Sequence, residues 1–408
     1  MNRKTVSSRF FTGLKSLVLV AVSMAVSWPL SLSAQDANVA SQLPSIKSKK
    51  ASESLLQDII RNGDRLVAVG ERGHIIYSDN NGKSWQQADV PTRAMLTAVY
   101  FVSAEKGWAV GYDGLVLNTA DGGKTWAIQL DGLKFTRKRM ADTIPALEDK
   151  IKSLQKDKAA AEEQLAEAEA NGEEDLTPYE DLVADLDDHL STLEGELDDA
   201  KASLSNTVAN PLMDVWFRDA DNGFVVGAFG EFLKTEDGGA TWESVAGSLD
   251  NEDRHHLNAV AGLGNLMYIA GESGYIYRSD DGGDTWSLLQ SPDPENGSFF
   301  AVNIISPDEV LVSGLRGAMY RSGDRGNSWK QIPEDLHKNM NSVYFAGNDT
   351  VLAVGNDGAF LRSRDGGRTF LSHVRKNRLT IASVVEAADG NYILVGSGGV
   401  QIVVPESL

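Results

Sequence analysis

The 408-residue chain contains no cysteine. Disulfide bonds, thiol nucleophiles and cysteine metal ligands are therefore excluded, and apolar packing has to hold the fold together. Its six histidines, at positions 74, 189, 255, 256, 337 and 373, are scattered without metal-ligand spacing. No serine stands in a Gly-x-Ser-x-Gly motif, and strands rather than helices are expected after the glycine-rich turns. We therefore expect no metal, no cofactor and no catalytic residue.

Basic residues are fewer than acidic ones: the chain has 38 Lys and Arg and 58 Asp and Glu, which gives a net charge of −20. A protein that binds nucleic acid has to neutralise phosphates with cationic side chains. Nucleic acid is therefore not an expected partner.

Long hydrophobic runs are missing except near the N-terminus. Arg3, Lys4, Arg9 and Lys15 precede an apolar run at residues 17–26, and small residues lead up to Ala34. This order is typical of an export signal, so we expect residues 1–34 to be removed by cleavage near Ala34. The mature protein is then expected in the periplasm, peripheral to the membrane. An uncleaved membrane anchor is the alternative, although the run is short for a bilayer.

Glycine is abundant and regularly spaced. A Gly-x-x-Gly pair occurs seven times, with first glycines at 70, 111, 227, 271, 314, 355 and 396. The steps are 41 to 44 residues, except for one of 116 that contains an insertion. Such a period, with four short alternating strands per unit, predicts an all-β fold, a seven-bladed β-propeller.

Six units also carry the phrase Ser/Thr-x-Asp-x-Gly-x-Thr/Ser-aromatic, known as an Asp-box, with Asn in place of Asp in the first copy. The copies lie at residues 78–85, 119–126, 235–242, 279–286, 322–329 and 363–370. The side chain at its third position can accept backbone hydrogen bonds within a turn. We assign this structural role to Asn80, Asp121, Asp237, Asp281, Asp324 and Asp365. Binding of calcium or sugar by these carboxylates is the alternative. The seventh unit lacks a box and an outer strand, so residues 35–50 are expected to supply its fourth strand and close the ring.

The insertion, residues 133–207, is rich in Ala, Leu, Glu, Lys and Asp. Its apolar residues recur at spacings of three and four, first at Ile144, Leu147, Ile151, Leu154, Ala161, Leu165 and Ala168, with Lys158 as the one break, and then at Tyr179, Leu182, Leu186, Leu190, Leu193, Leu197, Ala200 and Leu204. This predicts two helices of about 28 residues in an antiparallel coiled-coil hairpin about 40 Å long. The propeller then comprises residues 35–132 and 208–408. The hairpin is either a docking arm or a tolerated surface insertion.

Candidate partner contacts are the side chains between the paired glycines, which are expected to ring one mouth of the central channel: Arg72, Tyr112, Phe229 and Arg316. Arg137 and Arg139 stand at the root of the hairpin, and Arg375 and Arg378 precede the seventh unit on the same face. Loops on a rigid scaffold commonly bind partners. Ordinary solvated turns are the alternative.

These repeats resemble the photosystem II stability and assembly factor-like family, a branch of the Asp-box propellers, as in residues 212–227 followed by TEDGGATW. The resemblance covers nearly all of the chain outside the signal and the hairpin. It implies a non-enzymatic scaffold or assembly factor for a membrane complex. Similar exported proteins of non-photosynthetic bacteria suggest an RND-type transporter as that complex.

A sialidase-like glycoside hydrolase or a carbohydrate-binding propeller is the alternative function, since sialidases share the boxes. Carboxylates such as Glu71 and Glu272 could serve as acid and base. The chain lacks the sialidase opening phrase Phe/Tyr-Arg-Ile-Pro.

Overall fold

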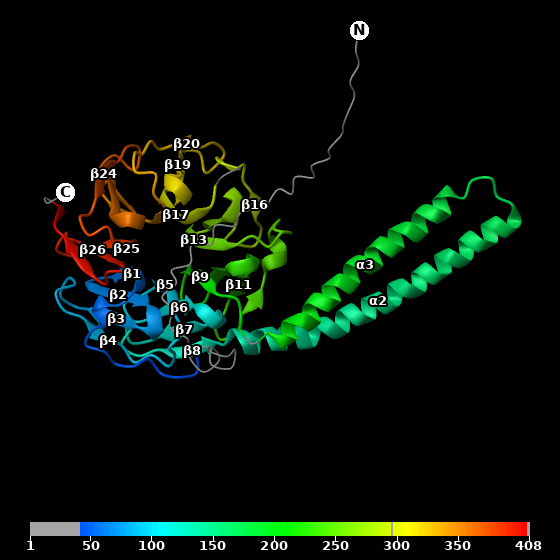
Figure 1. The fold of residues 1–408 in the computed structure, drawn as a ribbon, viewed down its shortest axis with the longest axis horizontal. Helices are drawn as coiled ribbons and strands as arrows, with labels where there is room; N and C mark the ends of the chain where they lie inside the picture. The colour runs from blue at the N-terminus through cyan, green and yellow to red at the C-terminus, as the bar shows by residue number, and fades with distance from the viewer. Residues whose placement is uncertain (1–40, 207, 295–296, 406–408) are drawn as a thin grey trace, which may run out of the picture.

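A computed structural model describes residues 41–206, 208–294 and 297–405 (Figure 1). The expected signal peptide, residues 1–34, lies outside the described residues. Within these residues, 27 strands form seven antiparallel sheets, and two long helices project to one side of them (Figure 1). The fold is therefore mostly β and propeller-like, as expected.

Six of the sheets contain four strands in chain order. The first three are β1 (Leu56–Asn62), β2 (Arg65–Gly70), β3 (Ile75–Ser78) and β4 (Gln86–Gln87); β5 (Leu96–Phe101), β6 (Gly107–Gly111), β7 (Val116–Thr119) and β8 (Ala127–Leu130); and β9 (Leu212–Phe217), β10 (Gly223–Gly227), β11 (Phe232–Thr235) and β12 (Glu243–Ser244).

The next three are β13 (Leu257–Leu263), β14 (Leu266–Gly271), β15 (Ile276–Ser279) and β16 (Ser287–Leu288); β17 (Phe299–Ser306), β18 (Glu309–Gly314), β19 (Met319–Ser322) and β20 (Lys330–Gln331); and β21 (Met340–Gly347), β22 (Thr350–Gly355), β23 (Ala359–Ser363) and β24 (Leu371–Val374). The seventh sheet has three strands: β25 (Ile381–Glu386), β26 (Tyr392–Gly396) and β27 (Gln401–Val403).

The sheets form a ring in which the first strand of each contacts the first strand of the next, and β25 returns to β1 (Figure 1). The second strands read as continuous buried runs because both of their faces lie between neighbouring sheets. Seven apolar clusters fill these spaces. Between the second and third sheets, for example, the rings of Trp108 and Phe217 stack.

Residues 35–50 were expected to supply the fourth strand of the seventh sheet; residues 35–40 lie outside the described part of the chain, and residues 41–50 form no strand with that sheet. This segment lies along the first sheet instead, where Ser45 N–H donates to the Val90 carbonyl and Lys47 Nζ donates to the Gln87 carbonyl. The Gln87 side chain adds further hydrogen bonds to the segment, and these polar groups draw it to β4. The ring is closed by contacts of β1 with β25 and by the Val400 N–H, which donates to the Ser52 carbonyl.

Two antiparallel helices connect β8 to β9: α2 (Gly132–Asn171) and α3 (Thr177–Ser205) (Figure 1). We refer to them as the arm. Asp131 caps α2 by accepting a hydrogen bond from the Lys134 N–H, and Gly172 ends it in the left-handed conformation. The 40 residues of α2 exceed the 28 expected, because this helix continues back through the basic residues to the edge of the ring. At 1.5 Å per residue it is about 60 Å long.

The two helices meet along a narrow seam. Leu147, Ile151 and Ala161 of α2 are buried there against Leu190 and Ala200 of α3. Leu182 and Leu204 were expected in the seam but are 43% and 41% exposed. Lys158 interrupts the apolar spacing of α2, and its ammonium forms an ion pair with Asp187 of α3 at 2.5 Å.

Candidate partner-binding face

The Gly-x-x-Gly turns lie at the ends of the second strands, on one face of the ring that we call the turn face. Six of the seven form a single 3-10 turn, the exception being the one at residues 396–399, and the two glycines are required for different reasons. A Cβ on the first glycine of the first sheet, Gly70, would lie 2.2 Å from the Leu55 carbonyl oxygen. The second, Gly73, has φ +68°, which glycine adopts without strain.

The residue before the second glycine is also left-handed although it has a side chain. The φ angles are 55° at Arg72, 57° at Phe229 and 55° at Arg316. This conformation costs an L-residue about 1 kcal/mol or more. All three side chains are exposed, as is Tyr112 at the other turn position. The four predicted contacts therefore reach solvent on the turn face.

They do not, however, ring the channel mouth, and that part of the prediction is wrong. On the turn-face side the channel is lined by the beginnings of the innermost strands, and of the turn side chains only Asn356 and Ser397 belong to the lining. Each innermost strand starts with a β-bulge whose extra residue occupies the mouth, as Gln57 and Asn258 do. Phe229 and Arg316 line two separate pockets farther out.

A ring of hydrogen bonds lines the channel and joins every neighbouring pair of innermost strands. We call it the inner ring. Its members are the Asp58 carboxylate with Val99 N–H, Thr97 hydroxyl with Leu212 carbonyl, Asp214 carboxylate with Val260 N–H, Asn258 amide with Phe299 carbonyl, Asn303 amide with Val343 carbonyl, Asn341 amide with Ile381 carbonyl, and Ser383 hydroxyl with Asp58 carboxylate. The polar lining of the channel is thus used within the fold.

Asp58 and Asp214 are two carboxylates of the inner ring whose pKa values are raised by burial. Burial, with a contribution from the charge of Asp58, raises the pKa of Asp214 to about 7, while hydrogen bonds from the backbone N–H groups of Val260 and Val215 oppose the rise. Burial also raises the pKa of Asp58. Both carboxylates accept backbone hydrogen bonds from the neighbouring innermost strand and so belong to the inner ring.

Glu71 and Glu272, the candidate acid and base pair, lie in different sheets and accept hydrogen bonds from the backbone. Glu71 Oε1 accepts from the Leu55 N–H at 3.3 Å, and Glu272 Oε2 accepts from the His256 N–H at 3.2 Å. Neither lines the channel.

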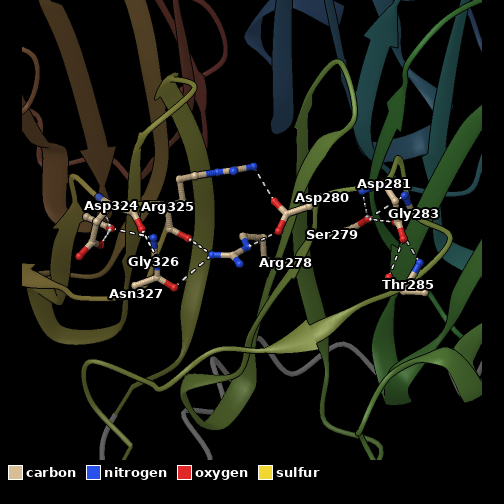
Figure 2. A network of polar contacts seen from close by, with 11 residues as sticks. Arg278, Ser279, Asp280, Asp281, Gly283, Thr285, Asp324, Arg325, Gly326 and Asn327 are labelled. Carbon is tan, nitrogen blue, oxygen red and sulfur yellow. Dashed lines mark hydrogen bonds and ion pairs between the residues drawn. The ribbon is translucent and has the colours of Figure 1, made fainter.

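The Asp-boxes lie at the opposite ends of the sheets and are closed by their own hydrogen bonds. In the fourth sheet, Asp281 accepts from the backbone N–H and hydroxyl of Thr285 and from the Ser279 hydroxyl (Figure 2). These bonds, the one with the Thr285 hydroxyl foremost, hold the pKa of Asp281 well below its usual range. The same acceptor position is occupied by Asn80, Asp121, Asp237, Asp324 and Asp365. Among the described residues, no group of three His, Asp or Glu is placed to hold a metal ion.

Boxes of neighbouring sheets are also joined to each other. Arg278 Nη1 donates to the Arg325 carbonyl of the next sheet at 2.8 Å, and Asp280 accepts from both Arg278 and Arg325 (Figure 2). The fourth and fifth sheets are therefore joined through polar groups of their boxes.

The basic residues at the root of the arm divide into two roles. Arg137 is exposed. Arg139 is half-buried, its Nη1 lies 3.5 Å from Glu231 Oε1 of the third sheet, and its guanidinium lies over the ring of Phe135. Arg139 thus ties the arm to the ring.

Of the two candidate arginines before the seventh sheet, Arg375 is packed against the ring and Arg378 is exposed. Arg375 packs against Gly358, and burial lowers the pKa of its guanidinium. Arg378 is exposed and has φ 49°. Sequence reasoning missed Arg254 and His256, which stand beside Phe229, because their connecting loop has no repeated motif.

The comparisons with known proteins agree with this architecture. A family model described as photosynthesis system II assembly factor YCF48 matches residues 77–143 and 199–340. The photosystem II assembly lipoprotein Ycf48 of Synechococcus sp. (strain CC9902) is 38% identical over 76 residues, which is 19% of this chain and 22% of that protein. The matched stretch thus spans about a fifth of that relative.

Solved structures share the fold at low identity. YCF48 from Cyanidioschyzon merolae gives a TM-score of 0.57 at 16% identity, covering 87% of this chain and 97% of that one. A structure titled YCF48 bound to D1 peptide gives a TM-score of 0.55 at 13% identity, covering 89% of this chain and 99% of that one. The GH74 enzyme of Niastella koreensis gives a TM-score of 0.54 at 12% identity, covering 85% of this chain and 52% of that one. At these identities the structures establish the fold alone. The family match spans just over half of the residues, and the chain belongs to the photosynthesis system II assembly factor YCF48 family.

Proposed function

We propose that this protein is a non-enzymatic assembly factor that binds a membrane protein complex through its turn face and its arm. The observation that carries the proposal is the family match at residues 77–143 and 199–340. One structural relative is described as bound to D1 peptide, so peptide binding occurs on this fold. In this chain, the exposed side chains Arg72, Tyr112 and Arg316 would contact the partner, with Arg378 and Arg137 extending the surface.

Several finer features belong to the proposal. The ring acts as a seven-bladed propeller and the arm as a coiled-coil hairpin that reaches a second part of the complex. Residues 1–34 direct export, which places the mature protein in the periplasm, peripheral to the membrane. No helix among the described residues is long and apolar enough to span a bilayer. An RND-type transporter is the partner class we propose to examine first.

The turn face and the arm can be tested separately by affinity purification from crosslinked native membranes. Three forms would be compared: the full chain, a form with residues 137–206 replaced by a short Gly-Ser linker, and the double variant Arg72→Glu, Arg316→Glu. We expect the full chain to recover one membrane complex and the charge-reversed form to lose it. Recovery that is unaffected by charge reversal would show that the turn face is not the binding surface.

A glycoside hydrolase remains the alternative in the same assay series. Turnover of aryl glycosides that is abolished by Glu71→Gln or Glu272→Gln would support it and contradict the scaffold proposal.

A further inference from the structure

A cleft of about 700 Å³ lies where the arm meets the ring. One wall is formed by the root of the arm, including Met140, Leu147 and Asp199. The other is formed by the third sheet and the connection after it, including Phe229 and Arg254. Its volume is in the range of pockets that hold small ligands, so it can accept a short stretch of chain rather than a folded domain.

The apolar part of this cleft includes the exposed phenyl ring of Phe229. The Phe229 side chain is 57% exposed, and its φ of 57° is strongly unfavourable for a bulky residue. The Phe229 N–H donates to His256 Nδ1 at 2.8 Å, and the His256 ring lies edge-on to the phenyl ring at 4.8 Å. The turn imposes the same left-handed φ at Arg72 and Arg316, so the feature that distinguishes this turn is the apolar ring that it exposes to solvent. An exposed aromatic side chain in a cleft indicates a contact role.

The charged part of the cleft is acidic. Arg139 is engaged with Glu231, which leaves Glu196, Asp199 and Glu252 in the lining against Arg254. The acidic character continues along the arm, since residues 159–200 contain neither lysine nor arginine. Carboxylates beside an exposed aromatic ring attract a cation by charge and by the π face of the ring. An anionic surface would be repelled here.

We propose that this cleft binds an extended segment of the partner protein in which an apolar side chain stands next to a lysine or arginine. The apolar side chain contacts Phe229, and the cation lies against Asp199 and Glu196. The inference rests on the proposed function and specifies the chemistry of the partner. Because the cleft has one wall on the arm and one on the ring, a segment bound in it would fix the arm relative to the turn face.

The test is photocrosslinking in the full-length protein in cells, with p-benzoylphenylalanine in place of Phe229. The same group in place of Leu371, which is 64% exposed on β24, is the positional control. We expect position 229 to crosslink to a membrane protein, in a peptide that mass spectrometry shows to carry Lys or Arg within three residues of the attachment site. Position 371 should not give this product.

The charge requirement is tested in the same background. Glu196→Gln combined with Asp199→Asn should lower the yield of the crosslinked product at position 229 at least five-fold. Asp181→Asn combined with Asp185→Asn, nearer the tip of the arm on α3, should leave that yield unchanged. Crosslinked peptides without a basic residue, a yield indifferent to Glu196 and Asp199, or attachment within the same chain would each overturn the proposal.

Failure of this inference is distinguishable from failure of the proposed function. If the purification described above recovers a membrane complex while position 229 gives no crosslink to it, the cleft proposal is wrong and the assembly function stands. If neither experiment yields a membrane protein, both are wrong.

Discussion

The Ser383 hydroxyl donates a 2.9 Å hydrogen bond to Oδ1 of Asp58, 325 positions away in the chain. The bond joins the innermost strand of the last sheet to that of the first, and it completes the inner ring. The same carboxylate accepts from the Val99 N–H through its other oxygen, so Asp58 links three consecutive sheets. The ring is thus closed by side-chain chemistry at its centre as well as by apolar packing.

Ser383→Ala should lower the free energy of unfolding by about 1 kcal/mol, the usual net contribution of such a hydrogen bond. Urea unfolding followed by tryptophan fluorescence measures the change. Ser287→Ala, at an exposed position of β16, is the matched control and should be neutral. Equal stability of the two variants would mean that the inner ring does not stabilise closure.

Asp214 should make stability depend on pH in an unusual direction. Its folded-state pKa of about 7 lies above the unfolded value of about 3.9, so the folded protein binds this proton more tightly. The resulting stabilisation is fully present below about pH 4 and is lost as the pH rises to about 7.

We therefore expect wild type to gain about 2 to 4 kcal/mol relative to Asp214→Asn between pH 7.5 and pH 4. Paired urea titrations at several pH values measure this difference, with Asp185→Asn on the arm as the control. A difference between wild type and Asp214→Asn that does not change with pH would show that folding does not raise the pKa of Asp214.

Arg139 should set the direction of the arm. Removing its contact with Glu231 by Arg139→Ala leaves the root of α2 held by fewer interactions, so the arm should sample more orientations. Distances between spin labels near Gly172 and on the ring should then broaden. Arg137→Ala, at an exposed neighbouring position, should leave them unchanged. Equally narrow distances for both variants would contradict the anchoring role.

Lys158 places a charge in an otherwise apolar seam, opposite Asp187. Polar residues at such positions fix the register of paired helices and lower their stability. Lys158→Leu should therefore raise the melting temperature of the helical signal at 222 nm, while Asp187→Ala should lower it. A fall in both variants would assign the ion pair a stabilising role instead.

Much of this fold could be predicted from sequence because the turns of each repeat are determined by residues within that repeat. Gly70 and Gly73 meet requirements that only glycine satisfies, and the box around Asp281 closes on its own neighbours. The arm was predicted from its spacing, but Leu182 and Leu204 were misplaced because a spacing of three or four does not determine which of two adjacent positions faces the partner helix.

The candidate site was less predictable, since it depends on contacts between distant segments. Nothing in the local sequence shows that Phe229 turns away from the channel toward the arm, or that residues 41–50 follow β4 rather than β27. Both depend on competition among surfaces formed only after the ring has closed.

The assembly function is tested most directly by separating the native membrane complexes of cells with and without this protein, by blue native electrophoresis with mass spectrometry of each slice. The account predicts that one membrane complex loses its full-size form and accumulates as smaller subassemblies without the protein. Wild type should restore the complex, and the Arg72→Glu, Arg316→Glu variant should not. Unchanged migration of every membrane complex would contradict the account.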